Sequence, residues 1–162
     1  MLILLPPSEK KAETTKPTPA IAVYQGVLYQ ALGWPTLSAA ARTRGEASVR
    51  IISAKYGAIA PSTRIESYKA KIDNKALAAQ VEEQLRLLAR GLIVDCRSST
   101  YSTVWTPNPH NTVGIRVFKK VAGQLKVITH MSKLTRGEVT RYLVSQAKNP
   151  RTPQELHQLL VE

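Results

Sequence analysis

Residues 126–143 have the sequence KVITHMSKLTRGEVTRYL, which indicates a strand followed directly by a helix. Val127 and Ile128 are β-branched residues, which favour the pleated surface of a sheet. Ser132 is a candidate N-cap, and apolar residues recur around it at helical spacing: Met131, Leu134, Val139, Tyr142 and Leu143. The stretch therefore predicts a strand and then an amphipathic helix with one apolar stripe.

The opposite face of this predicted helix carries Lys133, Gly137 and Arg141, with Arg136 beside it. A glycine inside an exposed helical face costs about 1 kcal/mol relative to alanine, so its presence needs a reason. One reason is that a phosphate or another backbone can approach closely between the two flanking cations. The alternative is a solvated basic helix face that binds nothing.

The remainder of the chain alternates between predicted strands and helices. Three apolar runs predict buried strands at residues 2–5, 49–53 and 92–95. Helical spacing predicts helices at residues 21–32, 36–43 and 75–90 and a terminal helix from Thr152, and residues 112–129 are predicted to form a β-hairpin. This order predicts an α/β (α+β) fold: a mixed sheet with helices packed on it, and a C-terminal hairpin followed by helices. The length of 162 residues favours a single domain, residues 1–162.

The composition restricts the classes of partner. The chain has 23 Lys plus Arg and 11 Asp plus Glu, a net charge of +12, which favours ligands that carry phosphate, nucleic acid first and nucleotides next. The single cysteine, Cys96, excludes an internal disulfide and provides no zinc framework. No apolar stretch is long enough for a signal peptide or a membrane span, so we expect a cytoplasmic protein with no membrane partner.

Polar and basic residues follow the predicted strands at the points where the strands end. These residues are Ser8, Glu9 and Lys10, then Lys55 and Tyr56, then Asp95, Arg97 and Ser98, and finally His130 and Lys133. Ligands of open α/β sheets bind outside the carboxyl ends of the strands, so we expect these side chains to line one shared crevice. The alternative is that they belong to ordinary solvated loops.

Specific catalytic motifs are absent from the sequence, which contains no GxGxxG, no P-loop and no nucleophile elbow. The three histidines are dispersed without metal-ligand spacing, so we predict no metal and no cofactor. Glu9, Asp95 or His130 could serve as acid or base in an enzyme that acts on a nucleotide or a nucleic-acid base. Because many cations lie near them, the carboxylates are more readily explained as halves of ion pairs.

The candidate residues for binding nucleic acid or another phosphate-bearing ligand come from all of these segments. They are Ser8, Lys10, Lys55, Tyr56, Lys69, Arg97, Ser98, His130, Lys133, Arg136 and Arg141. The cations can neutralise phosphates, and a tyrosine can stack on a base. A tyrosine more commonly packs its ring in the core and leaves its hydroxyl in water, which we expect of Tyr24 and Tyr29.

Five segments, in this order, resemble the YaaA family. They are residues 2–10 (LILLPPSEK), 23–29 (VYQGVLY), 53–61 (SAKYGAIAP), 95–101 (DCRSSTY) and 128–138 (ITHMSKLTRGE). The resemblance implies a bacterial cytosolic protein of the peroxide stress response, linked to lowering free intracellular iron and thereby limiting oxidative damage to DNA. It also implies DNA binding through a positively charged cleft, in an unusual α/β fold with a helix-hairpin-helix element and no established enzymatic activity.

The sequence departs from the family pattern in three places. Between Lys16 and Ile21 it lacks a helical segment of longer relatives that includes the helix-hairpin-helix, so DNA binding here would rest on the crevice cations alone. Lys10 replaces the usual glycine of the first block. A Tyr-Arg-Leu-x-Met block appears as residues 68–72, YKAKI, in which Lys69 keeps the positive charge of arginine but loses its bidentate fork.

Overall fold

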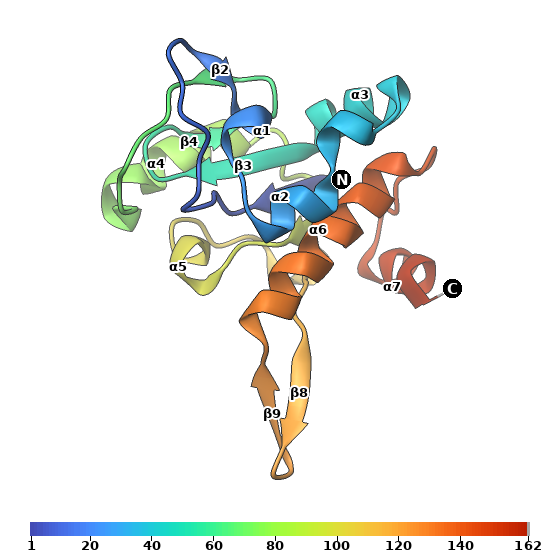
Figure 1. Ribbon diagram of the computed structural model, residues 1–162. Helices are drawn as coiled ribbons and strands as arrows, with labels where there is room; N and C mark the ends of the chain where they lie inside the picture. The colour runs from blue at the N-terminus through green and yellow to red at the C-terminus, as the bar shows by residue number, and fades with distance from the viewer. Residues whose placement is uncertain (162) are drawn as a thin grey trace.

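A five-stranded sheet forms the centre of the computed structural model, which describes residues 1–161 (Figure 1). Its order is β4-β3-β1-β6-β7, with β1 at Leu2–Leu5, β3 at Val49–Ser53, β4 at Gly57–Ile59, β6 at Ile93–Asp95 and β7 at Thr112–Gly114. β1 is parallel to β3 and β6, and β6 is parallel to β7, whereas β4 is antiparallel to β3. The predicted α/β class with a mixed sheet is therefore confirmed.

The apolar runs become strands that are buried on both faces. In β1, Leu2 and Leu4 belong to one buried cluster, whereas Ile3 and Leu5 belong to a second cluster on the opposite face. This division follows from the strand period, which points successive side chains to opposite faces of the sheet.

Helices cover both faces of the sheet. The Ile3 face packs against residues of α1 (Ala20–Val23), α2 (Val27–Leu32), α3 (Ala39–Ser48), α6 (Thr129–Ser145) and α7 (Pro153–Val161). The Leu2 face packs against α4 (Asn74–Leu85), which buries Leu77, Val81 and Leu85. The short helix α5 (Ser99–Ser102) follows β6. None of the helices within residues 1–161 is long and apolar enough to cross a membrane.

Two helices begin where a side chain satisfies the first free backbone N–H groups. The N–H of Ala76 donates to Asp73 Oδ1 at 2.9 Å before α4, and the N–H of Ala41 donates to Ser38 Oγ at 3.1 Å before α3. Asp73 and Ser38 are thus the N-caps of α4 and α3. The helix that the sequence predicts at residues 36–43 lies at Ala39–Ser48 instead, after a 3-10 turn at Trp34–Thr36.

The prediction of one continuous helix at residues 21–32 is wrong, because the chain leaves the helix between α1 and α2. Tyr24 forms an isolated antiparallel bridge with Lys11, and the N–H of Gln25 donates to the Lys10 carbonyl at 3.0 Å. Gly26 then has a φ of 114°, which a side chain would strain. Pairing with the segment after β1 therefore overrides the local helical pattern.

The predicted hairpin at residues 112–129 is shorter than expected. Thr112–Gly114 joins the central sheet as β7, and only β8 (Phe118–Val121) and β9 (Gln124–Val127) form the hairpin. Its turn lies at Ala122 and Gly123, with φ values of 49° and 80°. A second short antiparallel pair, β2 (Thr18–Pro19) with β5 (Arg64–Ile65), has no counterpart among the predicted strands.

The face assigned to α6 from the sequence is wrong in part, although Leu143 is buried as predicted. The helix buries Ser132, Arg136, Gly137, Thr140, Leu143 and Val144, whereas Met131 and Tyr142 are each 42% exposed. A Cβ atom on Gly137 would overlap the carbonyl oxygen of Leu28 and lie 2.7 Å from the Cβ of Ala31. The sequence suggests that Gly137 lets either a phosphate or another backbone come close. The structure shows that it lets the backbone of α2 approach, and it does not open a path for phosphate.

The two edge strands of the sheet, β4 and β7, contain three residues each. The side chains of α4 hold β4 in place, because the N–H of Ala58 donates to Gln84 Oε1 at 2.6 Å and Gln80 Nε2 donates to the Tyr56 carbonyl at 3.1 Å. The edge beside α4 is thus tied to a helix as well as to β3.

Candidate functional site

The parallel strands end on the same side of the sheet, and the chain changes direction there. From β1 the chain continues to β3 on one side, whereas from β6 it continues to β7 on the other side. The carboxyl ends of β1 and β6 therefore flank a topological switch point, which is the usual position of a ligand site in an open α/β sheet.

A cavity of about 390 Å³ lies at these strand ends. We define the crevice as its lining residues: Ser8, Glu9, Lys11, Tyr68, Lys69, Ala70, Lys71 and Tyr101. Ser8 is fixed in place because its Oγ accepts the N–H of Gln25 at 2.9 Å and donates to the Lys10 carbonyl at 2.5 Å. The crevice thus combines three ammonium groups and three hydroxyls with a single carboxylate, a donor-rich set suited to an anion.

A chain of hydroxyl groups supports the wall of the crevice. Tyr68 Oη lies 2.8 Å from both Tyr24 Oη and Ser53 Oγ. The Lys11 Nζ lies 4.6 Å from the centre of the Tyr68 ring, within the range of a cation–π contact. Burial lowers the pKa of the Lys11 ammonium, and the nearby Glu9 opposes that shift. Lys11 is therefore held against the aromatic wall at the mouth of the crevice.

Several of the predicted site residues lie in or beside the crevice. Ser8 and Lys69 line it, and the exposed Lys10 is joined through its carbonyl to Ser8 and Gln25. The ring of Tyr56 packs edge-on against Tyr68 at 5.7 Å, and Lys55 Nζ lies 5.2 Å from the centre of the Tyr56 ring. Segments after β1, β3 and β5 therefore meet here.

Arg97 lies in the interior and already has partners. Its guanidinium binds both oxygens of Asp95, at 2.9 and 2.8 Å, and its Nη1 donates to the carbonyls of Tyr101 and Trp105. The side chain is 0% exposed. The expectation that Asp95 forms an ion pair is thus confirmed, and Arg97 holds the loop after β6 together instead of facing the crevice mouth. Ser98, half-buried, precedes α5.

Two further predicted cations on α6 also serve the fold. Arg141 Nη1 donates to the carbonyls of Leu32 and Gly33, at 2.9 and 3.0 Å, and so caps the C-terminus of α2. Its predicted position on a free basic face with Gly137 is therefore wrong. Arg136 is only 7% exposed, and its Nε donates to the Ile115 carbonyl after β7 at 2.8 Å.

Arg136 differs from Arg97 in having no acidic partner within residues 1–161. Burial lowers the pKa of its guanidinium, the neighbouring Cys96 raises it, Arg116 lowers it and Asp95 raises it. Burial raises the pKa of the Cys96 thiol to about 12, so the thiol is neutral and does not neutralise the arginine. Arg136 thus has no direct ion-pair partner in the described part of the chain, although the Asp95 carboxylate favours its charged form.

The predicted acid–base group is not assembled. Glu9 lines the crevice, whereas both oxygens of Asp95 bind Arg97. His130 lies on the first turn of α6 and is exposed, and Lys133, further along the helix, is also exposed. No hydrogen bond joins Glu9, Asp95 or His130 to one another in the part of the chain that the structure describes. Among residues 1–161 no three His, Cys, Asp or Glu side chains are placed to hold a metal ion.

Sequence reasoning missed Lys11 and Lys71 as lining residues. Lys71 could have been found, because it is a second cation two residues from Lys69 in a stretch that forms no helix or strand. The position of Lys11 depends on its pairing with Tyr24, for which the sequence carries no local signal.

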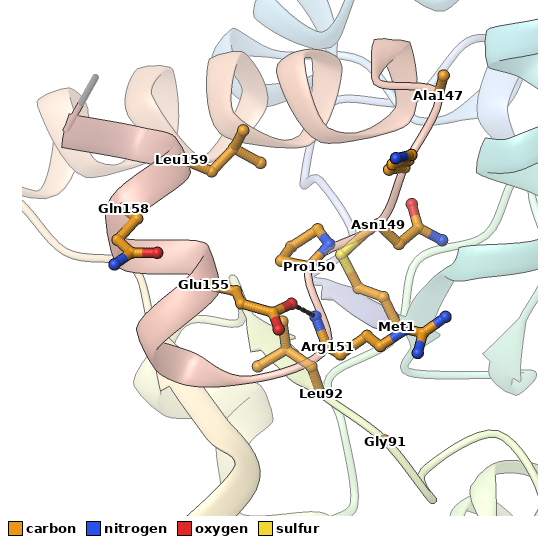
Figure 2. A pocket seen from close by; sticks show the side chains of 11 residues that line it. Met1, Gly91, Leu92, Ala147, Asn149, Pro150, Arg151, Glu155, Gln158 and Leu159 are labelled. Carbon is orange, nitrogen blue, oxygen red and sulfur yellow. Dashed lines mark hydrogen bonds between the residues drawn. The ribbon is translucent and has the colours of Figure 1, made fainter.

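A larger cavity, of about 1100 Å³, lies at the opposite end of the sheet (Figure 2). Met1, Gly91 and Leu92, which precede β1 and β6, line it together with the segment that joins α6 to α7. None of the candidate binding residues predicted from the sequence lines this cavity. Figure 2 shows the Glu155 side chain directed at the backbone N–H of Arg151, which donates a hydrogen bond to it. The crevice is therefore the better candidate for the functional site.

Ionisation of buried tyrosines is predicted to destabilise the protein at alkaline pH. Burial raises the pKa of Tyr24 and of Tyr29 above the ordinary 10.0, so the folded state keeps protons that the unfolded state loses. The free energy of unfolding should then fall as the pH rises above 10.0, while Lys11, whose pKa is lowered, acts in the opposite sense.

Comparison with Tyr29→Phe isolates the tyrosine contribution. Below pH 10.0 the wild type should be more stable than this variant, because the Tyr29 hydroxyl donates to the Pro6 carbonyl at 2.6 Å. Above that pH the difference in the free energy of unfolding, measured by urea denaturation, should shrink. A difference that stays constant up to about pH 11 would contradict the linkage.

Comparison with known proteins identifies relatives of this chain. A family model described as "Peroxide stress protein YaaA" matches residues 8–162. A UPF0246 protein of Streptomyces coelicolor is 34% identical over 155 residues, which cover 88% of this chain and 59% of the relative. A UPF0246 protein of Corynebacterium glutamicum is 30% identical over 162 residues, covering 92% of this chain and 64% of that protein. The chain thus spans about three fifths of the length of these curated relatives.

Proposed function

Because the chain belongs to the family of peroxide stress protein YaaA, we propose that it acts in peroxide stress by binding the phosphate groups of DNA in the crevice. The observation that carries the proposal is the placement of Lys11, Lys69 and Lys71 around one cavity at the carboxyl ends of the strands, against the single carboxylate of Glu9. Cations arranged around a groove supply most of the affinity for a nucleic-acid backbone.

Lys55 and Lys10, both exposed beside the crevice, extend the positive surface beyond its mouth. These cations together provide a track for several phosphates rather than a site for one.

Charge reversal at the crevice tests the proposal. In the double variant Lys69→Glu/Lys71→Glu, the affinity for a DNA duplex should fall at least about tenfold, and the slope of log K against log salt should decrease by about 1.8, which is about 0.9 for each lost phosphate contact. Fluorescence anisotropy over a series of salt concentrations measures both quantities. Both lysines are exposed, so the fold should be retained.

The matched control is Lys148→Glu/Arg151→Glu. These two exposed cations line the cavity at the other end of the sheet, and their reversal changes the net charge by the same amount. The control should retain most of the affinity. Equal losses in the two double variants would show that overall charge alone drives binding, and the crevice would not be the site.

The link to free iron is proposed to run through the phosphate ligand instead of through iron held by this chain. The supporting observation is that the side chains of residues 1–161 form no group of three candidate metal ligands. Protein purified without chelators should therefore carry iron far below one equivalent per chain. Stoichiometric iron, measured by elemental analysis, would overturn this part of the proposal.

A second candidate function is an enzyme that acts on a nucleotide, because Glu9 places a carboxylate inside the crevice beside Lys11. A general acid or base needs this kind of position, within reach of a bound substrate. Turnover of a nucleoside triphosphate that Glu9→Gln abolishes, with nucleotide binding retained, would favour the enzyme over the DNA-binding protein.

A further inference from the structure

The β8–β9 hairpin is a surface that the proposed crevice does not use. It extends away from the rest of the molecule (Figure 1), and all eight of its strand residues are exposed. Its side chains nevertheless include large apolar groups: Phe118 is 49% exposed, Val127 50% and Leu125 70%. A lone two-stranded hairpin is only marginally stable in water. Packing within the hairpin therefore does not explain why it carries these exposed apolar groups.

The register of the hairpin gives it two different faces. Phe118 pairs with Val127 and Lys120 with Leu125, whereas Lys119 pairs with Lys126 and Val121 with Gln124. Directly paired residues lie on the same face, and faces alternate along each strand. One face is therefore mainly apolar, and the other places Lys119 and Lys126 opposite each other.

Opposed lysines indicate an anionic partner. Like charges directly across a strand pair are unfavourable, and an anion bridging them removes the repulsion. The surrounding sequence supplies no carboxylate for this purpose, since residues 96–137 contain seven Lys or Arg and no Asp or Glu. The partner must then be a polyanion that also accepts apolar contacts.

We propose that this hairpin is an arm that lies in the major groove of B-form DNA, a second contact that rests on the proposed DNA-binding function. The groove is wide enough to admit a two-stranded ribbon, and it presents thymine methyl groups to apolar side chains. Lys119, Lys120 and Lys126 can reach the phosphates that border it. The crevice holds backbone phosphates, and the arm supplies the preference for a duplex.

Other polyanions and partners fit the hairpin less well. The major groove of A-form RNA is deep and narrow, so an RNA duplex does not admit the ribbon. A bilayer takes apolar and basic side chains from the same side, whereas here only Lys120 shares the face of the apolar residues and the Lys119/Lys126 pair lies on the opposite face. A second copy of the chain that paired through the apolar faces would leave the Lys119/Lys126 pair without an anion.

The test separates the arm from the crevice by ligand length. Lys119→Gln/Lys126→Gln removes the opposed charges and Leu125→Ser/Val127→Thr removes apolar contacts, while Lys148→Gln/Arg151→Gln is the charge-matched control at the far end of the sheet. Each variant is titrated with a DNA duplex of about two helical turns, the same sequence as an RNA duplex, a single-stranded DNA tetranucleotide and anionic phosphatidylserine vesicles. Urea unfolding checks that each variant remains folded.

The expected results differ for each ligand. Raising the salt from roughly 50 to roughly 200 mM should weaken DNA-duplex binding in both proteins. In the lysine variant this loss of affinity should be about tenfold smaller than in the wild type, as two lost phosphate contacts predict. The apolar variant should weaken the DNA duplex at every salt concentration. Both arm variants should bind the tetranucleotide as the wild type does, and the wild type should prefer the DNA duplex to the RNA duplex.

Three results would overturn the arm. The first is unchanged duplex affinity in both arm variants, which leaves the crevice proposal intact if the Lys69/Lys71 reversal still weakens binding. The second is equal affinity for DNA and RNA duplexes, and the third is vesicle binding that the arm variants abolish while duplex binding persists. Loss of tetranucleotide binding on reversal of Lys69 and Lys71 alone, with the duplex unaffected, would contradict the crevice as a duplex site but not the arm.

Discussion

Replacing Gly137 by alanine is expected to destabilise the protein by about 3 kcal/mol, or to prevent folding, even though alanine favours helices by about 1 kcal/mol over glycine. The added Cβ would overlap the Leu28 carbonyl oxygen and lie 2.7 Å from Ala31 Cβ, so α2 and α6 would have to separate. Both helices pack on the Ile3 face of the sheet, and their separation would loosen the buried cluster there. Thermal and urea unfolding measure the effect.

Gly91→Ala provides the control for this prediction. A Cβ at Gly91 meets nothing within 4 Å, so the substitution should change the free energy of unfolding by no more than about 0.5 kcal/mol. If Gly137→Ala were as stable as Gly91→Ala, the close approach of the α2 backbone to α6 would be refuted. In that case Gly137 could again be considered as an access point for a ligand.

Replacing Arg97 by methionine should cost about 3–5 kcal/mol, because breaking a buried ion pair leaves an uncompensated charge. Asp95, whose side chain is 17% exposed, would lose both of its bonds to the guanidinium, and the carbonyls of Tyr101 and Trp105 would lose their donor. Since these carbonyls belong to the loop that carries Tyr101 to the crevice, nucleic-acid binding should weaken as well. Urea unfolding and anisotropy measure the two effects.

Two comparisons isolate the contribution of the ion pair. The double variant Asp95→Leu/Arg97→Met removes both charges and should be more stable than Arg97→Met alone. Arg86→Met breaks the Glu83–Arg86 pair, whose side chains are 61% and 73% exposed, and should change stability by no more than about 0.5 kcal/mol. Equal effects of Arg97→Met and Arg86→Met would show that burial does not strengthen the Asp95–Arg97 pair.

The central sheet could be predicted from the sequence because its strands carry a strong local signal. The runs at residues 2–5 and 49–53 are apolar on both faces, and they occur as β1 and β3 with the predicted bounds. The helix α4 was predictable for the same reason, since Leu77, Val81 and Leu85 recur at helical spacing after the Asp73 cap. Elements whose own residues determine their burial are therefore predicted well.

The orientation of α6 could not be predicted, because the position of α2 determines it. Apolar periodicity assigns Met131 and Tyr142 to the core, but the helix buries Gly137 and Thr140 where α2 comes close. The long side chains of Arg136 and Arg141 reach backbone carbonyls that are 21 and 109 residues away in the chain. A sequence pattern carries no information on such distant acceptors.

For the candidate site, the residues predicted from the sequence include only part of the crevice lining. Ser8 lines the crevice because it follows the parallel strand β1, whereas Lys69, which also lines it, follows β5 of the separate antiparallel pair. Arg97 and Arg141 were chosen for their charge, yet their guanidinium groups are already used inside the fold. Charge in a sequence indicates a possible ligand contact, whereas only the structure shows whether that charge is free.

The short edge strands have a consequence for self-association. Long exposed edges act as templates on which further chains add strands and form aggregates, and natural proteins avoid this with short or covered edges. Here each edge strand contains only three residues, and the glutamines of α4 occupy backbone groups next to and within β4. The central sheet therefore offers little template for amyloid-like growth.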